Sequence, residues 1–346
     1  MSDNYRMCLY GKENVKLEQG CPTPSPSYGE IQVRIHTVGI CGTDIHMWQS
    51  GELGGAGIKF PIVMGHEATG SISCVGGGVT KLRVGDRVAL EAIIACRQCH
   101  GCLSGKYNIC QDRNILGTER NGFQQKFVVV PERNCHILPV SIPLDTGVLL
   151  EPLSVTVHAC ERGQVAIGDV VVISGSGSVG LLQMQTVKAA GAQVVYITDI
   201  LPERLALAAS LGADHTLDVS NMDSKEVARR VEKTLGKKAD VTFECVGNDQ
   251  SIATSIYATR SGGRVVIVGV PSGISRVPVD DAVLKEIDII TTLGYKDSFP
   301  KAISLLEQGK VKVAGLITDR YGLGDIDKAY RHVRSGAGIK SVMSLE

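Results

Sequence analysis

A glycine-rich stretch near the middle of the 346-residue chain constrains the fold more than any other feature. The continuous apolar run Asp169–Ser174 is typical of a strand that is buried on both faces. The pattern G-x-G-x-x-G follows at Gly175, Gly177 and Gly180, and helix-like apolar spacing then covers Val179–Ala190. Strand, glycine turn and helix in this order predict that the helix N-terminus binds the pyrophosphate of a dinucleotide.

An acidic residue in the right place supports this interpretation. Asp199 ends the next predicted strand, 19 residues after Gly180. A carboxylate at this position binds the ribose 2′-hydroxyl and repels a 2′-phosphate, so we expect NAD rather than NADP. Two interpretations of Arg204 stay open: a contact with the adenosine side of the coenzyme, or a solvated charge on a helix.

The chain divides into two kinds of pattern. The first 150 or so residues read as short strands separated by turns, with strands at 30–36, 68–75 and 86–90. From about residue 154, strands and helices alternate, which predicts a doubly wound parallel sheet. Its further strands are expected at 193–198, 240–246, 263–269 and 286–292, the last three of them buried, with a helix at 202–211. The last 50 residues predict helices at 300–308 and from 325 onward, around an apolar segment at 316–319.

Composition narrows the function classes. The length predicts two domains. Lys and Arg number 36, as do Asp and Glu, which argues against a basic nucleic-acid surface, so we expect no nucleic-acid partner. The N-terminus lacks an apolar signal segment, and the uncharged run 170–187 is interrupted by glycines and polar residues, so we expect no membrane partner. We therefore expect a cytoplasmic protein whose 11 cysteines are reduced.

Four cysteines lie close together in a segment that lacks a regular apolar pattern. Cys96, Cys99, Cys102 and Cys110 fall within 15 residues. Four thiolates at this spacing favour a structural zinc that closes a lobe without a core of its own. The alternative is a group of reduced cysteines that bind no metal.

A second group of possible metal ligands is spread over three segments. Cys41 and His46 lie in 39–46, His66 and Glu67 lie in 65–70, and Glu151 begins 151–154. Cysteine, histidine and glutamate are all zinc ligands, but no segment has a close ligand spacing by itself. A buried cysteine, or a histidine paired with a nearby glutamate, would explain the same residues.

Taken together, these motifs resemble the zinc-dependent medium-chain alcohol and polyol dehydrogenases, in the sorbitol dehydrogenase branch. The resemblance covers nearly the whole chain and follows the order of the family's motifs. The stretch Glu151–Val155 points to the polyol branch. The matching segments are 39–46, 65–70, 84–89, the four-cysteine lobe, 151–159 and the glycine-rich turn.

This resemblance implies an α/β chain with a GroES-like, mostly β catalytic domain built from both ends, residues 1–153 and 293–346. A Rossmann domain over 154–292 is inserted into it, and the structural-zinc lobe covers 94–113. The resemblance also implies a catalytic zinc held by Cys41, His66 and Glu67, with Glu151 as a partner through water or as an alternative direct ligand. Which glutamate binds directly stays open. Each chain would thus hold two zinc ions and NAD, and two or four chains would assemble through the strand near residue 290.

The expected reaction is hydride transfer between a secondary alcohol and NAD, with zinc lowering the pKa of the hydroxyl. Thr43 would pass the proton on, and His46 is either a relay or a hydrogen-bonded loop histidine. The residues expected to contact the coenzyme are Gly175, Gly177, Ser178, Val179, Gly180, Asp199, Ile200, Arg204, Val246, Gly247, Gly269, Val270, Leu293 and Gly294.

The substrate is expected to be a small alcohol or its ketone, in contact with Thr43, Glu151 and the positions of Met47 and Tyr295. Sorbitol dehydrogenases often carry Tyr where this chain has Met47, and Arg where it has Gly294. The polyol interpretation therefore has an alternative: the same chemistry on L-threonine, a cyclitol or a vicinal diol. A binding protein without catalysis is a third possibility, but the chain has every expected zinc ligand.

Overall fold

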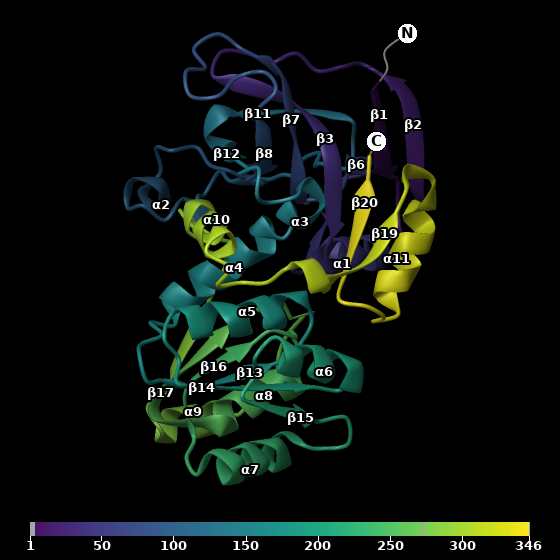
Figure 1. The fold of residues 1–346 in the computed structure, drawn as a ribbon. Coiled ribbons are helices and arrows are strands. Elements are labelled where there is room, and N and C mark those ends of the chain that lie inside the picture. The colour runs from purple at the N-terminus through teal and green to yellow at the C-terminus, as the bar shows by residue number, and fades with distance from the viewer. Residues whose placement is uncertain (1–3, 272, 346) are drawn as a thin grey trace. The chain divides into compact units, whose positions relative to one another are not determined.

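The computed structural model describes residues 4–271 and 273–345. It divides into two compact units (Figure 1). Unit 1 runs up to Glu151 and resumes at Val313, and unit 2 is Pro152–Lys312. Unit 2 is therefore inserted into the sequence of unit 1.

Unit 1 is mostly β structure, as predicted. Its largest sheet has seven strands in the order β12-β8-β7-β3-β20-β19, and β11 also pairs with β3. The long strand β3 (Glu30–Ile40) pairs antiparallel with β7 (Glu67–Val75) on one side and with β20 (Lys340–Ser344) on the other. Figure 1 shows the yellow C-terminal strand β20 beside the purple strand β3. Residues about 300 positions apart in the sequence are thus neighbours in one sheet.

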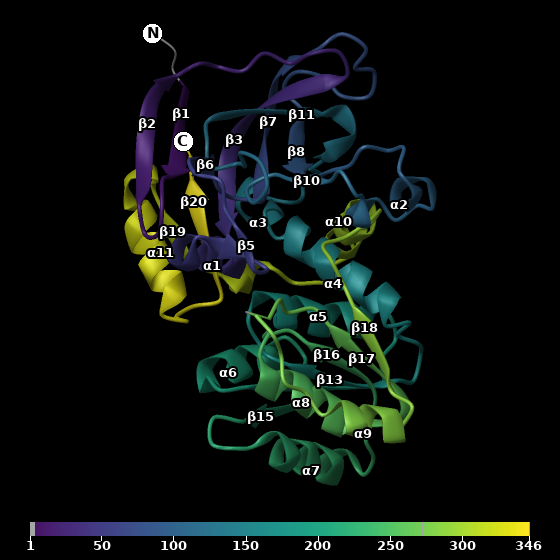
Figure 2. The same cartoon turned by 180° about the vertical axis from the view of Figure 1, so that it is seen from behind.

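Shorter elements complete unit 1 (Figure 2). A three-stranded sheet has the order β2-β1-β6, and helix α1 (Gly42–Ser50) follows β3 directly. Trp48 on α1 is fully buried and packs edge-on against Tyr330 of α11. The remaining elements are β1 (Asn4–Leu9), β2 (Val15–Cys21), β4 (Glu52–Leu53), β5 (Ala56–Gly57), β6 (Ile62–Val63), β8 (Arg87–Leu90), β9 (Ile93–Ile94), α2 (His100–Leu103), η1 (Tyr107–Ile109), β10 (Asn114–Ile115), β11 (Phe127–Pro131), η2 (Glu132–Asn134), β12 (Cys135–Ile137), α3 (Leu144–Gly147), η3 (Ala314–Leu316), β19 (Ile317–Tyr321), η4 (Leu323–Asp325) and α11 (Ile326–Arg334).

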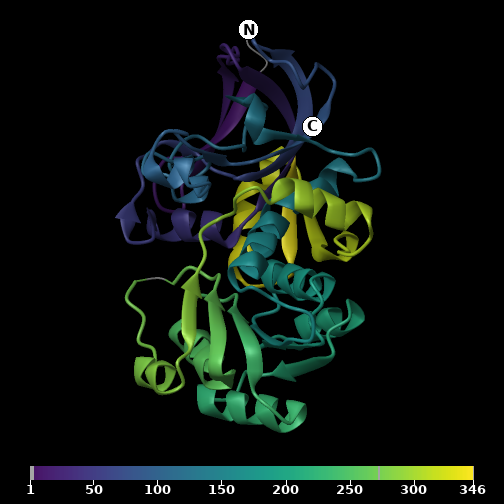
Figure 3. The same cartoon turned by 90° about the vertical axis from the view of Figure 1, so that its left-hand side faces the viewer.

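Unit 2 contains the predicted parallel sheet (Figure 3). Six strands pair in the order β15-β14-β13-β16-β17-β18, and every pairing is parallel. This is the strand order 3-2-1-4-5-6 of dinucleotide-binding folds, in which ligands bind where the order reverses, beside the first strand. The strands are β13 (Val170–Ser174), β14 (Val194–Asp199), β15 (His215–Asp218), β16 (Ala239–Glu244), β17 (Thr259–Ile267) and β18 (Asp288–Thr291).

Helices cover both faces of this sheet. Figures 1 and 2 show α5 on one side of the sheet and α8 on the other. Strand β13 is buried along its whole length, as its uninterrupted apolar sequence predicted. The helices are α4 (Leu150–Arg162), which begins in unit 1, α5 (Ser178–Ala189), α6 (Pro202–Ser210), α7 (Ser224–Leu235), α8 (Asp249–Ala258), α9 (Val279–Leu284) and α10 (Phe299–Glu307).

Strand β18 corrects one sequence prediction. Its apolar residues predicted a buried strand, but it lies at the edge of the sheet, and Ile289 is 40% exposed. An edge strand has only one neighbour, so apolar content alone does not show whether it is covered.

The division into units places residues 293–312 in unit 2, whereas the sequence interpretation assigned them to the first domain. Side-chain contacts within unit 2 account for this placement. The Gln185 amide nitrogen donates to the Lys312 carbonyl at 3.1 Å, and Lys301 on α10 pairs with Glu161 on α4. Within the described ranges, no helix is long and apolar enough to span a membrane.

Candidate functional site

Three possible zinc ligands from two distant segments meet in unit 1. The ligand atoms of Cys41, His66 and Glu67 all lie within 4.8 Å of one another. Cys41 caps the N-terminus of α1, and Glu67 is the first residue of β7. His66 is only 7% exposed, and its Nδ1 has no hydrogen-bond partner among the described residues. A buried, unsatisfied imidazole nitrogen beside a thiol and a carboxylate fits the donor set of a zinc site.

The buried carboxylate of Asp44 joins the two segments. Its Oδ2 accepts the Cys41 backbone N–H at 2.9 Å, and its Oδ1 accepts the Gly65 N–H at 3.3 Å. Oδ1 also lies 3.6 Å from Nδ1 of His66. Burial lowers the pKa of His66, but the negative charges of Asp44 and Cys41 outweigh this and raise it well above the usual value. Asp44 therefore orients two ligand-bearing segments at once.

Lys340 supplies the positive charge beside Glu67. It is the first residue of β20 and is 3% exposed, and Glu67 is 1% exposed. The Lys340 ammonium contacts both Glu67 oxygens, with 2.5 Å to Oε1. Burial lowers the pKa of Lys340, but the charges of Glu67 and Cys41 outweigh this and raise it above its usual value. Any side chain at position 39 would clash with the Glu67 carboxylate, because its Cβ would lie 2.0 Å from Oε2, so Gly39 makes room for this pair.

Glu151 is not one of the three clustered ligands, although the charges of His66 and Glu67 affect its pKa. Burial raises the pKa of Glu151 to about 7. The charge of His66 opposes this rise, and the charge of Glu67 adds to it. Of the two glutamates between which the sequence left the choice open, the structure groups Glu67 with the cysteine and the histidine.

Other predicted catalytic and substrate positions differ in exposure. Thr43 is half-buried and His46 is exposed, both on α1 next to Cys41. Met47 is fully buried in the hydrophobic core of unit 1, so the structure gives it a packing role instead of the predicted substrate contact. Tyr295 is 1% exposed and packs edge-on against Phe299 in unit 2, which likewise leaves little surface for a substrate.

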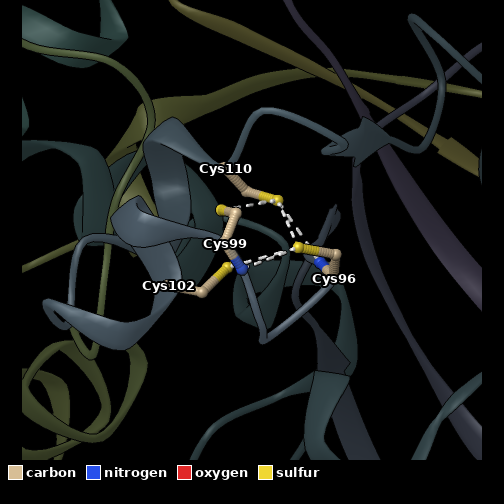
Figure 4. A group of neighbouring side chains, drawn as sticks. All are labelled: Cys96, Cys99, Cys102 and Cys110. Atoms are coloured by element: carbon tan, nitrogen blue, oxygen red, sulfur yellow. Dashed lines mark hydrogen bonds between the residues drawn. The ribbon is translucent and has the colours of Figure 1, made fainter.

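The four cysteines of the lobe converge on one point (Figure 4). Sγ of Cys110 lies 3.4 Å from that of Cys96 and 3.7 Å from that of Cys99, and the Cys96 and Cys102 sulfurs are 4.0 Å apart. Four sulfurs arranged tetrahedrally at ~2.3 Å from a zinc ion would be about 3.8 Å apart. Backbone hydrogen bonds from Cys102 and Gln111 lower the pKa of the Cys99 thiol to about 6, which favours a thiolate. The geometry therefore fits a structural zinc.

A crevice of about 360 Å³ lies at the glycine-rich turn in unit 2. Gly175 has a φ of 95°, a conformation that favours glycine, and a Cβ at Gly180 would lie 1.9 Å from the Gly175 carbonyl oxygen. Gly177 caps the N-terminus of α5. The turn thus brings Gly175 and Gly177 into the lining of the crevice, directly before the first turn of α5.

Asp199 and Arg204 both line this crevice. The Asp199 carboxylate accepts the backbone N–H of Ser176 at 2.6 Å, and those of Ile200 at 2.8 Å and Leu201 at 3.0 Å. It therefore shapes the glycine turn and also places a negative charge in the crevice. The side chain of Arg204 approaches the turn, 3.7 Å from where a Cβ of Gly177 would be.

The structure brings some of the expected coenzyme residues together but leaves others outside the crevice. The predicted residues that line it are Gly175, Gly177, Asp199, Ile200, Arg204 and Val246. The predicted residues outside its lining are Ser178, Val179, Gly180, Gly247, Gly269, Val270, Leu293 and Gly294. The lining residues that were not predicted are Ser174, Thr198, Val219, Ser220, Val227, Cys245, Asn248, Gln250, Ser251 and Thr254.

Sequence reasoning missed three buried charged residues: Asp44 and Lys340 beside the clustered ligands, and Glu244 at the end of β16. Asp44 stands three residues after Cys41, where a capping residue is expected, so its spacing was a usable signal. Glu244 interrupts an apolar strand, which is also visible in the sequence. Lys340 carried no signal, because 273 residues separate it from Glu67.

Comparison with known proteins agrees with this geometry. Residues 27–140 match the family model of the alcohol dehydrogenase GroES-like domain, and residues 178–308 match that of zinc-binding dehydrogenases. The chain is 38% identical to human sorbitol dehydrogenase over 345 residues, which cover 99% of this chain and 96% of that protein.

Two solved structures are similar throughout. An alcohol dehydrogenase from Escherichia coli CFT073, complexed with NADH, has a TM-score of 0.91 at 26% identity, covering 99% of this chain and 100% of that one. A 2R,3R-butanediol dehydrogenase from Bacillus subtilis has a TM-score of 0.89 at 28% identity, with the same coverage. The motifs, both cysteine-containing clusters, the fold and the full-length identity lead to one conclusion: the chain belongs to the zinc-binding medium-chain dehydrogenases.

Proposed function

We propose that this dehydrogenase transfers a hydride between a secondary alcohol of a polyol and NAD, interconverting a polyol and a ketose. The cluster of Cys41, His66 and Glu67 is the observation that carries this proposal. It brings together a thiol, an imidazole and a carboxylate, which is a donor set that zinc prefers, in a chain 38% identical to a sorbitol dehydrogenase. The Glu-Pro-Leu-Ser stretch that begins at Glu151 supports the polyol class.

A zinc ion bound by these three residues would act as a Lewis acid that lowers the pKa of the substrate hydroxyl. The residues of this chain prepare the site. Asp44 holds the Cys41 and His66 segments together, and the Lys340 ammonium binds the Glu67 carboxylate. The Thr43 hydroxyl accepts the substrate proton and passes it to water, with the exposed His46 imidazole as relay.

NAD is the proposed coenzyme. The Asp199 carboxylate lines the crevice and would repel a 2′-phosphate, and a relative of similar fold was solved with NADH. The glycine turn would receive the pyrophosphate, and Arg204 the adenosine side.

The protein is also proposed to act as a dimer or tetramer. The exposed edge strand β18 carries Ile289, and the neighbouring helix α9 exposes Val283 and Leu284, which are 69% and 86% exposed. A second copy would cover these apolar side chains and continue the sheet. The balanced charge fits a small neutral substrate better than nucleic acid, and a cytoplasmic location stays a prediction.

A second candidate substrate class is a vicinal diol. The similarity to a butanediol dehydrogenase favours it, and Gly294 replaces an arginine that sorbitol dehydrogenases often carry. L-threonine and cyclitols remain within the same chemistry.

A substrate panel distinguishes these classes. NAD reduction is measured with sorbitol, xylitol, ribitol, galactitol, inositol, L-threonine and 2,3-butanediol, with Cys41→Ser as the matched inactive control. We expect the highest kcat/KM on an acyclic polyol. Preference for butanediol would replace the substrate class, and no turnover of any compound would refute the proposal.

A further inference from the structure

Glu244 is a buried charge at the end of an apolar strand. It is the last residue of β16 and is 0% exposed. No ion pair joins it to a cation anywhere in 4–271 and 273–345. A carboxylate in such a position needs hydrogen-bond donors instead.

One turn supplies these donors. Glu244 Oε1 accepts the backbone N–H of Val246 at 2.7 Å and that of Gly247 at 2.8 Å. The same oxygen accepts the Ser251 hydroxyl at 2.7 Å. Ser251 also takes part in the capping box of α8 with Asn248. A single oxygen thus fixes the turn 245–248 and the start of the following helix, and Val246, Asn248 and Ser251 line the crevice.

The backbone of Glu244 holds a second loop. Its carbonyl oxygen accepts the N–H groups of Val268 at 2.8 Å and Gly269 at 3.0 Å. The two loops are packed tightly, because a Cβ at Gly269 would lie 2.4 Å from the Gly247 nitrogen and 2.8 Å from Glu244 Oε2. Glu244 therefore connects the two loops that carry four of the expected coenzyme residues.

The charge state of this side chain matters to the geometry. Oε2 is buried and has no hydrogen-bond partner within the described part of the chain. A glutamine would accept the three hydrogen bonds with its carbonyl oxygen, but its NH₂ group would take the place of Oε2 with no acceptor. An unsatisfied buried donor is costly, so the amide is expected to disturb the turn.

Building on the proposed NAD-dependent function, we propose that Glu244 is a positioning residue for the coenzyme. Its buried carboxylate holds the turn 245–248 in the shape that binds NAD, without touching the coenzyme itself, and its backbone carbonyl joins the loop 268–269 to this turn. Its loss weakens coenzyme binding and leaves hydride transfer from bound coenzyme intact.

The test compares three variants in the full-length, zinc-loaded enzyme. For Glu244→Gln we expect the Kd of NADH and the KM of NAD to rise about tenfold, because the unsatisfied NH₂ group disturbs the turn. We expect kcat at saturating NAD and the KM of the alcohol to stay within about twofold, with unchanged zinc content. Ser251→Ala removes only one of the three donors, and its Kd should rise about threefold.

Asp240→Asn is the matched control. Asp240 lies at the other end of the same strand, where it binds the Val170 N–H at 2.9 Å and Arg260 at 2.7 Å. This variant should lose stability without any change in the Kd of NADH.

Three results would overturn the inference: an unchanged Kd in folded Glu244→Gln, an equal rise in Asp240→Asn, or a fall in kcat with Kd unchanged. If Glu244→Gln does not fold, Glu244→Asp takes its place, because its shorter carboxylate keeps the charge but is withdrawn from the turn; an unchanged Kd in folded Glu244→Asp would then overturn the inference. Failure of the unsubstituted enzyme to bind NADH would instead refute the proposed coenzyme, on which the inference rests.

Discussion

Replacing Lys340 by Met tests how the candidate zinc site is held together without its metal. The substitution keeps most of the apolar stem of the side chain and removes its ammonium. Lys340 and Glu67 are 3% and 1% exposed, so the Glu67 carboxylate would keep a buried charge without its cation. Breaking a buried pair in this way costs about 3–5 kcal/mol. We expect metal-free Lys340→Met to lose about 3 kcal/mol of unfolding free energy.

Urea unfolding measured by tryptophan fluorescence is a suitable assay. Trp48 is the single tryptophan of the chain and is fully buried in unit 1, so its signal reports on the unit that contains the pair. With an m-value of about 2 kcal/mol/M, the midpoint should fall by about 1.5 M. Bound zinc would neutralise Glu67, so the loss should be smaller in zinc-loaded protein.

Two further variants make the measurement specific. Arg320 lies on β19, the strand next to β20, and forms an exposed ion pair with Asp145. Arg320→Met breaks this pair and should lower the unfolding free energy much less. Adding Glu67→Gln to Lys340→Met should recover part of the stability, because no buried charge is then left unpaired. A loss below about 1 kcal/mol in metal-free Lys340→Met, or one equal to that of Arg320→Met, would refute the reasoning.

Three other predictions follow from the described sites. Cys102→Ser should lower the zinc content from two ions per chain to one and make the lobe sensitive to limited proteolysis; unchanged zinc content would rule out the four-cysteine site. Asp199→Ala should raise the Kd of NADH about tenfold and that of NADPH much less, because the lost carboxylate would bind the 2′-hydroxyl of NADH but repel the 2′-phosphate of NADPH. The same carboxylate also binds the Ser176 N–H, and both Kd values are measured by fluorescence titration. A fall in NADH affinity no greater than that in NADPH affinity would contradict this role. Ile289→Lys should place charges on the exposed edge strand and shift sedimentation toward monomers, whereas an unchanged oligomer would locate the interface elsewhere.

Local patterns predicted much of unit 2. The apolar run that became β13, the glycine turn and the apolar spacing of α5 each act over a few residues, so their sequence predicts their structure. The burial of β18 was predicted wrongly because exposure at a sheet edge depends on strand order and not on the strand itself. The short, exposed strand β15 has no strong apolar alternation and was not predicted.

The two metal sites also differ in how well local sequence predicts them. The four cysteines of the lobe lie so close in sequence that their spacing alone predicted a cluster. Cys41 and Glu67 are brought together only by the pairing of β3 with β7, and Lys340 only by the pairing of β20 with β3. Residue chemistry by itself therefore left this second site open, and family resemblance had to indicate it. Met47 shows that a position matched by resemblance can still be occupied by a core side chain.

Zinc analysis of Cys41→Ser, combined with coenzyme binding and activity, tests directly whether Cys41 binds a catalytic zinc. We expect two zinc ions per chain and polyol-dependent NAD reduction in the unsubstituted enzyme. Cys41→Ser should hold one zinc ion, bind NADH with unchanged Kd and reduce no NAD, because the metal site and the coenzyme crevice are built by different units. A Cys41→Ser enzyme that keeps both zinc ions, or that oxidises alcohols at the full rate, would contradict the account.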